Sequence, residues 1–213
     1  MRGGLSHRGI VRQVGRRHPS AKASGVSHLP ERNAGRPIVK KKLATVWLDG
    51  CSGCHMSFLD MDERLIDLAE HFDLVYSPIV DQKIFPPDVD ISLVEGSVST
   101  DADEHKIKLI RERTATLVSL GDCAVTGNVP AMRNAFTVDS ILERAFGDRP
   151  VTHPEIFQGL PKLLPRVRPI HEVVKVDVFV PGCPPSADTI YTLLRELLSG
   201  GSVDVARLTR FGA

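Results

Sequence analysis

Long apolar runs, aromatic residues and cysteines are all scarce in this sequence. Aromatic side chains make up 5% of its 213 residues, with one tryptophan and two tyrosines. A membrane-spanning helix needs about 20 consecutive apolar residues, whereas the apolar stretches here, such as residues 43–48, have the length of a β-strand. We therefore expect no membrane span. Hydrophobic residues still make up 42% of the chain, which is enough for a sizeable core.

The sequence also lacks the short motifs by which many enzymes hold a nucleotide or build a nucleophile. Neither a G-x-G-x-x-G fingerprint nor a P-loop occurs, and these are the glycine-rich loops that cradle phosphates. No Ser, His and Asp residues stand in an order typical of a hydrolase triad. We expect no nicotinamide site on this chain.

Only four cysteines are present, and their number alone fits disulfides, a metal site or unrelated core residues. The pair Arg16 and Arg17 is followed by polar residues, whereas a twin-arginine export signal continues with an apolar segment. Without export, structural disulfides are disfavoured, because reducing compartments keep thiols free. Metal binding becomes the favoured interpretation.

Charge is distributed unevenly along the chain. Residues 1–42 hold eleven basic and one acidic residue (net +10), and the remainder holds sixteen basic and twenty-five acidic residues (net −9). We interpret residues 1–42 as a basic, disordered arm and residues 43–213 as one folded domain. A nucleic-acid-binding arm is not favoured, because no aromatic residues are interleaved with the basic ones.

Strand-like and helix-like segments alternate from residue 43 onward. Strands are predicted over residues 43–48, 73–77, 89–94, 114–120 and 175–180, and helices over residues 57–71, 101–113, 138–146 and 186–198. The proline-rich residues 147–174 are predicted to be irregular. This alternation predicts an α/β domain with a mostly parallel sheet, and its order resembles a flavodoxin-like three-layer fold.

The cysteines share one position relative to the predicted strands. Cys51 and Cys54 follow the first strand, Cys123 follows the fourth, and Cys183 follows the fifth. Glu95 ends the third strand. Because the carboxyl ends of parallel strands meet at one edge, where open α/β folds bind ligands, we expect four thiols and a carboxylate in one crevice.

This arrangement leaves four interpretations of the cysteines open. A [4Fe–4S] cluster is favoured, because Cys51-x-x-Cys54 can reach one centre and each cysteine turn has a glycine beside it for close approach. A Cys₄ zinc site usually pairs two Cys-x-x-Cys knuckles, and this chain has one. A thioredoxin-like redox pair would not need Cys123 and Cys183. The fourth interpretation is that Cys123 and Cys183 are simply buried in the core.

Acidic and imidazole side chains lie beside the predicted thiol crevice. Glu95 is a candidate proton relay, and the alternative is a helix or loop cap. His55 is a candidate partner of the cluster or of another subunit, with a solvent-facing or capping role as the alternative. Asp49 and Asp122 are most simply residues that form turns.

Several motifs of this chain resemble the small subunit of nickel–iron hydrogenases, most closely that of the soluble bidirectional NAD(P)-linked enzymes. Four motifs carry the resemblance in order: Trp47-Leu-Asp-Gly-Cys-Ser-Gly-Cys-His-Met-Ser-Phe58, Val94-Glu-Gly-Ser97, Gly121-Asp-Cys-Ala-Val-Thr-Gly127 and Pro181-Gly-Cys-Pro-Pro185. Three shorter segments also look like that subfamily: Phe58-Leu-Asp-Met-Asp-Glu63, Pro130-Ala-Met-Arg-Asn134 and His171-Glu-Val-Val174. The resemblance covers roughly residues 43–200.

The resemblance implies an electron-transfer subunit with no catalytic residue of its own. It implies one proximal [4Fe–4S] cluster bound by Cys51, Cys54, Cys123 and Cys183. It also implies a large subunit whose Ni–Fe site splits and forms H₂ reversibly, and diaphorase subunits with FMN and further clusters that reduce NAD(P). Without cysteines for more clusters or a usable export signal, a cytoplasmic enzyme is expected. The basic arm departs from the family's usual short start.

Two alternatives accompany this interpretation. The cluster-bearing subunit of respiratory complex I is similar in fold, but it has adjacent cysteines where this chain has Cys51-Ser-Gly-Cys54. A zinc-stabilised interaction module without redox activity is the other.

Overall fold

The computed structural model describes residues 39–147, 158–201 and 203–209. Of the basic arm expected over residues 1–42, the first 38 residues lie outside this part of the chain. Lys41 and Lys42 already belong to the first strand, so the folded domain begins two residues earlier than predicted. None of the described helices is long and apolar enough to cross a membrane.

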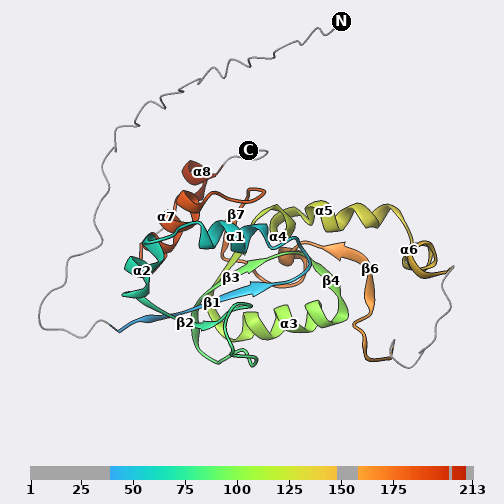
Figure 1. The fold of residues 1–213 in the computed structure, drawn as a ribbon, viewed down its shortest axis with the longest axis horizontal. Coiled ribbons are helices and arrows are strands. Elements are labelled where there is room, and N and C mark those ends of the chain that lie inside the picture. The colour runs from blue at the N-terminus through green and yellow to red at the C-terminus, as the bar shows by residue number, and fades with distance from the viewer. Residues whose placement is uncertain (1–38, 148–157, 202, 210–213) are drawn as a thin grey trace, which may run out of the picture. The chain divides into compact units, whose positions relative to one another are not determined.

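A five-stranded parallel sheet forms the centre of the domain (Figure 1). Its strands are β1 (Lys41–Trp47), β2 (Phe72–Tyr76), β3 (Val89–Glu95), β5 (Thr114–Leu120) and β7 (Val178–Val180). They lie in the order β2-β1-β3-β5-β7, and every neighbouring pair is parallel. Counting only these five strands in chain order gives 2-1-3-4-5, the flavodoxin-like order. The predicted fold class is confirmed.

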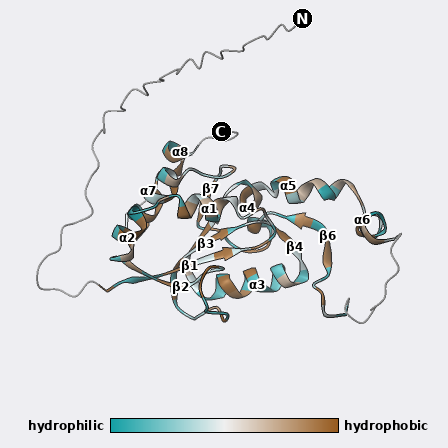
Figure 2. Cartoon of the chain, in the orientation of Figure 1, coloured by the Kyte–Doolittle hydropathy of each residue, from teal (hydrophilic) through white to brown (hydrophobic). Residues whose placement is uncertain are grey.

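Helices cover both faces of the sheet, and each face has its own core. Leu43 of β1 packs with Phe58, Leu68 and Ile190, which come from the helices α1 (Gly53–Leu59), α2 (Arg64–Ala69) and α7 (Ala187–Leu198). On the other face, Ala44 and Val46 of the same strand pack with side chains of α3 (Asp101–Glu112) and α4 (Asp122–Thr126). Because both faces are covered, the central strands β1, β3 and β5 are mostly apolar, although buried polar side chains such as Thr45 and Ser92 interrupt the apolar runs (Figure 2).

The remaining helices are short, except for one predicted with correct bounds. That helix is α6 (Val138–Phe146), which begins after Thr137. The short elements are α5 (Asn128–Ala131), the 3₁₀ helices η1 (Met132–Ala135) and η3 (Ile170–Glu172), and α8 (Val205–Leu208). The helix α3 starts with a capping box, in which Thr100 and Asp103 bond each other's main-chain N–H.

The prediction of one helix over residues 57–71 is wrong. Two helices, α1 and α2, occupy this region, and α1 begins four residues earlier, inside the cysteine segment. Asp62 lies between them with a φ of 50°, in the left-handed region that breaks a helix. Met61 beside it is 1% exposed, so burial of this side chain in the core accompanies the change of direction.

The prediction that residues 147–174 are irregular is wrong for the second half of that segment. Residues 148–157 lie outside the described residues, but β6 (Leu163–Arg168) is a strand that pairs antiparallel with β4 (Val98–Thr100). This pairing joins segments more than 60 residues apart, so no local pattern announces it. The strand predicted over residues 175–180 is shorter, with β7 spanning Val178–Val180.

Candidate metal centre

The four cysteines lie on three turns that follow three strands of the parallel sheet. Cys51 and Cys54 follow β1, with Cys54 inside α1; Cys123 follows β5, inside α4; and Cys183 follows β7. Strands β1, β5 and β7 run in the same direction, so all three turns lie at the carboxyl edge of the sheet. All four thiols are free.

The three turns touch one another. A Cβ atom placed on Gly121 would lie 2.2 Å from the Sγ atom of Cys54, and one on Gly50 would lie 3.9 Å from the Cβ atom of Cys123. Gly121 also has a φ of +83°, a conformation that suits glycine. Glycine is therefore required at Gly121, because any side chain there would displace a cysteine sulfur.

Asp122 connects the turn of Cys123 to the turn of Cys183. Its Oδ1 atom accepts a hydrogen bond from the Gly182 N–H at 2.7 Å, and its own N–H donates to the Gly182 carbonyl at 2.9 Å. Gly121 adds a third bond, from its N–H to the Val180 carbonyl at 2.8 Å. The sequence predicted only a turn-forming role for Asp122. In the structure this residue also connects two cysteine turns.

Asp49 makes a similar connection on the other side of the first cysteine loop. Its main chain pairs with Ser97 through bonds of 2.7 and 3.1 Å, and its carboxylate accepts a hydrogen bond from the Ser99 hydroxyl. The loop that begins at Gly50 is thereby anchored to the segment that follows β3.

The electrostatics of the thiol set by itself oppose ionisation. Burial raises the pKa of Cys54, and the nearby Glu95, Cys123 and Cys51 raise it further. The pKa of Cys123 is raised by burial and then by Cys51 and Cys183, against a main-chain bond from Val129. Thiolates gathered this closely require a positive centre to stabilise them, and iron supplies one. The donor set thus fits an iron–sulfur cluster.

Three N–H groups point at cysteine sulfurs. The Gly53 N–H donates to Cys51 Sγ at 3.4 Å, the Asn128 Nδ2 atom donates to Cys183 Sγ at 3.5 Å, and the Val129 N–H bonds Cys123. Such donors are typical of iron–sulfur sites, where they tune the sulfur ligands. Sequence reasoning missed Asn128 and Val129, although both stand directly after the Gly121–Gly127 motif.

Glu95 lies at the end of β3 and is 2% exposed. Its Oε2 atom accepts a hydrogen bond from the His55 N–H at 2.9 Å, which caps the first turn of α1. The carboxylate also contacts the Cys54 thiol. The capping alternative is therefore observed, and the same geometry places a carboxylate against a cysteine of the candidate site.

His55 is buried, at 9% exposure, so it does not face solvent. Its Nδ1 atom lies 3.0 Å from Glu95 Oε1, but the two are not aligned for a hydrogen bond. This contact places an imidazole next to the carboxylate.

No three His, Cys, Asp or Glu side chains among the described residues are close enough to share a single metal ion. A [4Fe–4S] cluster differs from a single ion because each thiolate binds its own iron at a corner of a larger core. Four thiols on three contacting turns have the chemistry and the separate positions that such a core requires.

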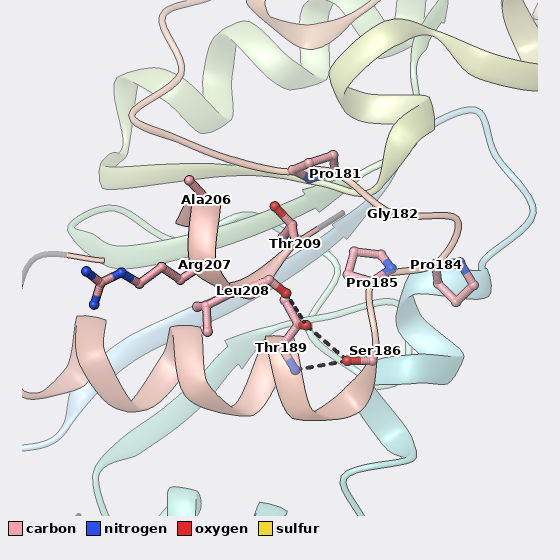
Figure 3. Close-up of a pocket in the computed structure, with 10 residues that line it drawn as sticks. All are labelled: Pro181, Gly182, Pro184, Pro185, Ser186, Thr189, Ala206, Arg207, Leu208 and Thr209. Atoms are coloured by element: carbon pink, nitrogen blue, oxygen red, sulfur yellow. Dashed lines mark hydrogen bonds between the residues drawn. The ribbon is translucent and has the colours of Figure 1, made fainter. Parts of the chain in front are cut away.

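A cavity of about 530 Å³ adjoins the Cys183 turn (Figure 3). It lies between the 181–186 segment, the start of α7, and α8. Its polar groups are already bonded: Thr189 donates to the Leu208 carbonyl at 2.9 Å, and Ser186 caps α7. We assign no chemistry to it.

The fold and the thiol set define an α/β chain of flavodoxin-like topology with four cysteines at the ligand-binding edge of its sheet. The family described as "NADH ubiquinone oxidoreductase, 20 Kd subunit" matches residues 51–197, and the chain belongs to this family.

Relatives of this chain include hydrogenase subunits. The chain is 43% identical over 176 residues to the NAD-reducing hydrogenase HoxS subunit delta of Cupriavidus necator, covering 78% of this chain and 82% of that one. It is 36% identical over 172 residues to a subunit of the F420-non-reducing hydrogenase of Methanothermobacter marburgensis, covering 78% of this chain but only 56% of that relative. The chain thus spans little more than half the length of the second relative.

A solved structure is similar over nearly its whole length. A chain in the crystal structure of an NAD⁺-reducing [NiFe]-hydrogenase in the H₂-reduced state superposes with a TM-score of 0.73 and 39% identity, covering 81% of this chain and 99% of that one. The resemblance to small subunits of NAD-linked nickel–iron hydrogenases, first seen in the motifs, is confirmed.

Proposed function

We propose that this chain is the electron-transfer small subunit of a cytoplasmic, NAD(P)-linked nickel–iron hydrogenase. One proximal [4Fe–4S] cluster, bound by Cys51, Cys54, Cys123 and Cys183, relays electrons between a Ni–Fe site in a large subunit and a diaphorase module that holds FMN and NAD(P). The complex oxidises H₂ and reduces protons reversibly. Contact among the three cysteine turns at one sheet edge carries the proposal.

The cluster supplies one-electron transfer when bound, and the residues of this chain provide its ligands and surround it. Four thiols on three strand ends provide ligands whose spacing is held by the Asp49 and Asp122 connections. Main-chain and side-chain N–H groups stabilise the sulfur charge. Cys54 and Cys123 are both partly buried, which limits the access of water to half of the ligand set.

Exposed apolar side chains near the thiols support the proposal that a large partner subunit binds at this edge. Cys51 and Cys183 are exposed. Met56 on α1 is 59% exposed, Val129 on α5 is 62% exposed, and Met132 at the start of η1 is 72% exposed. Apolar side chains of this size on the surface are typical of protein interfaces. Met56 and Val129 belong to elements that carry or bond a cysteine, and Met132 directly follows α5.

The first test is replacement of Cys183 by serine in the purified complex. We expect loss of H₂-dependent NAD⁺ reduction, because the cluster loses a thiolate ligand and the electron path is broken. Iron, acid-labile sulfide and the electron paramagnetic resonance (EPR) signal of the reduced complex are measured alongside activity. Retained activity at the wild-type rate would contradict the relay.

The second test addresses Glu95 as a proton relay. Glu95→Gln keeps an oxygen that can accept the His55 N–H but removes the exchangeable proton. We expect an assembled cluster and slower proton-coupled turnover, measured as H₂ evolution and H/D exchange. Glu95→Ala is the structural control, since it removes the cap as well. Unchanged turnover in Glu95→Gln would leave Glu95 with the capping role alone.

Two alternative functions each differ from the proposed function in one specific feature. The family description favours a complex I-type subunit, and the Cys51-Ser-Gly-Cys54 spacing argues for the hydrogenase branch. A zinc-stabilised interaction module would contain one zinc and neither iron nor acid-labile sulfide. Metal analysis of the purified complex separates this module from both redox functions.

A further inference from the structure

Asn128 is a polar residue of the site whose side chain donates directly to a cysteine sulfur. Its Nδ2 atom lies 3.5 Å from Cys183 Sγ, a contact across 55 positions of the sequence. In the part of the chain that the structure describes, the other N–H groups at cysteine sulfurs belong to the main chains of Gly53 and Val129. Asn128 is therefore the donor that a substitution can remove.

The backbone explains why asparagine occupies this position. Asn128 has a φ of 32°, and it follows Gly127, which has a φ of +85°. Asparagine tolerates positive φ better than other residues with side chains, apart from aspartate. The turn that ends α4 and begins α5 thus directs the amide toward the Cys183 turn, while the next residue, Val129, bonds Cys123 with its main chain.

The contacted sulfur belongs to one of the two exposed cysteines. Cys183 is exposed, as Cys51 is, so without Asn128 its hydrogen bonding would come from water or from a partner surface. A fixed N–H donor withdraws charge from a thiolate and stabilises the more negative, reduced state of a cluster. Hydrogen bonds to sulfur are therefore one of the levers that set reduction potential.

We propose that Asn128 is a positioning residue that orients Cys183 and raises the reduction potential of the cluster through its side-chain amide. The inference rests on the proposed function, because it requires the four cysteines to hold an iron–sulfur cluster. It goes further by assigning to one residue outside the ligand set a role in setting the potential.

The test uses two variants of the complete complex that keep the backbone conformation available. Asn128→Gly removes the donor and tolerates positive φ, and Asn128→Asp keeps the shape but replaces the donor with a charged acceptor. EPR-monitored redox titration gives the midpoint potential. We expect it to fall in the order wild type, Gly, Asp, with the Asp variant showing about a tenfold lower reduced-to-oxidised ratio at fixed potential, which is about 59 mV for one electron.

Thr126→Ala is the matched control from the same segment. Its hydroxyl donates to the Asp122 carbonyl and not to a sulfur, so the midpoint potential should equal that of the wild type.

Full iron and sulfide content with an unchanged potential in both Asn128 variants would overturn the inference while leaving the proposed function intact. Cluster loss in Asn128→Gly alone would also overturn it, by showing that the residue retains the cluster without tuning it. A wild-type complex whose small subunit has no iron or sulfide would instead contradict the proposed function.

Discussion

At the scale of single residues, the candidate site depends on side chains that are not ligands. Asp122 accepts the Gly182 N–H and so couples two cysteine turns. Glu95 caps the helix that contains Cys54. Each of these carboxylates accepts a hydrogen bond from a main-chain N–H of a segment that contains or adjoins a cysteine.

Asp122 gives a prediction at this scale. Asp122→Ala leaves the buried Gly182 N–H without its acceptor, and such a loss costs about 1–3 kcal/mol in the free energy of unfolding. Asp122→Asn keeps an oxygen at the same place and should cost less. Thermal and denaturant unfolding of the two variants, with iron content measured in parallel, checks this. Equal stability of Asp122→Ala and the wild type would show that the bond to Gly182 contributes nothing.

At the scale of elements, three separate segments meet at Asp177. Its Oδ2 atom accepts from the Leu117 N–H of β5 at 2.9 Å and from Arg111 of α3 at 2.5 Å. Burial raises the pKa of Asp177, but the bonds from Leu117 and Arg111 outweigh it, so the pKa lies below its ordinary value of 3.8. The residue thus joins α3, β5 and the segment that leads into β7.

This lowered pKa predicts a pH dependence of stability. A carboxyl whose pKa is lower in the folded state stabilises the fold above the ordinary value and loses this contribution as the pH falls through the folded-state value. The wild-type chain should therefore lose stability below about pH 4 more steeply than Asp177→Asn. Urea unfolding from pH 6 to pH 3 measures both curves. Parallel curves across this range would show that Asp177 is not the group responsible.

At the scale of the whole molecule, two hydrophobic cores cover the two faces of the sheet, and the proposed cluster would join the turns at its carboxyl edge. The cysteine turns are joined by a few hydrogen bonds, whereas Leu43, Ile107 and Ile190 are completely buried beside the strands. A cluster that binds all three turns of the folded state stabilises them by linkage. The two parts of the domain should respond differently when iron is removed.

Removal of iron by a chelator under oxidising conditions tests this difference. We expect a lower melting temperature and faster amide hydrogen exchange in residues 49–54, 121–129 and 181–185. The helix α3, whose Ile107 and Ile110 are fully buried, should keep its protection and serves as the internal control. Equal changes in α3 and in the three turns would contradict a local role for the cluster.

Local sequence pattern predicted the layers of the fold and singled out the four cysteines as candidate ligands. The first sheet strand was recognisable because residues 43–48 form a largely apolar run, which is typical of a strand buried on both faces. The position of each cysteine after a strand was equally local. The parallel sheet then brought these ends to one edge, because its strands all run in one direction.

Tertiary structure decided what lies between and around those elements. Burial of Met61 and the left-handed Asp62 divide one expected helix into two. Pairing of β4 with β6, the bond from Gly182 to Asp122, and the contact of Asn128 with Cys183 each join residues more than 50 positions apart. No periodicity in the sequence predicts such contacts, because they form only after folding has brought distant segments together. The sequence by itself therefore determined which residues are candidate ligands, and only the tertiary structure decided which side chains lie against them.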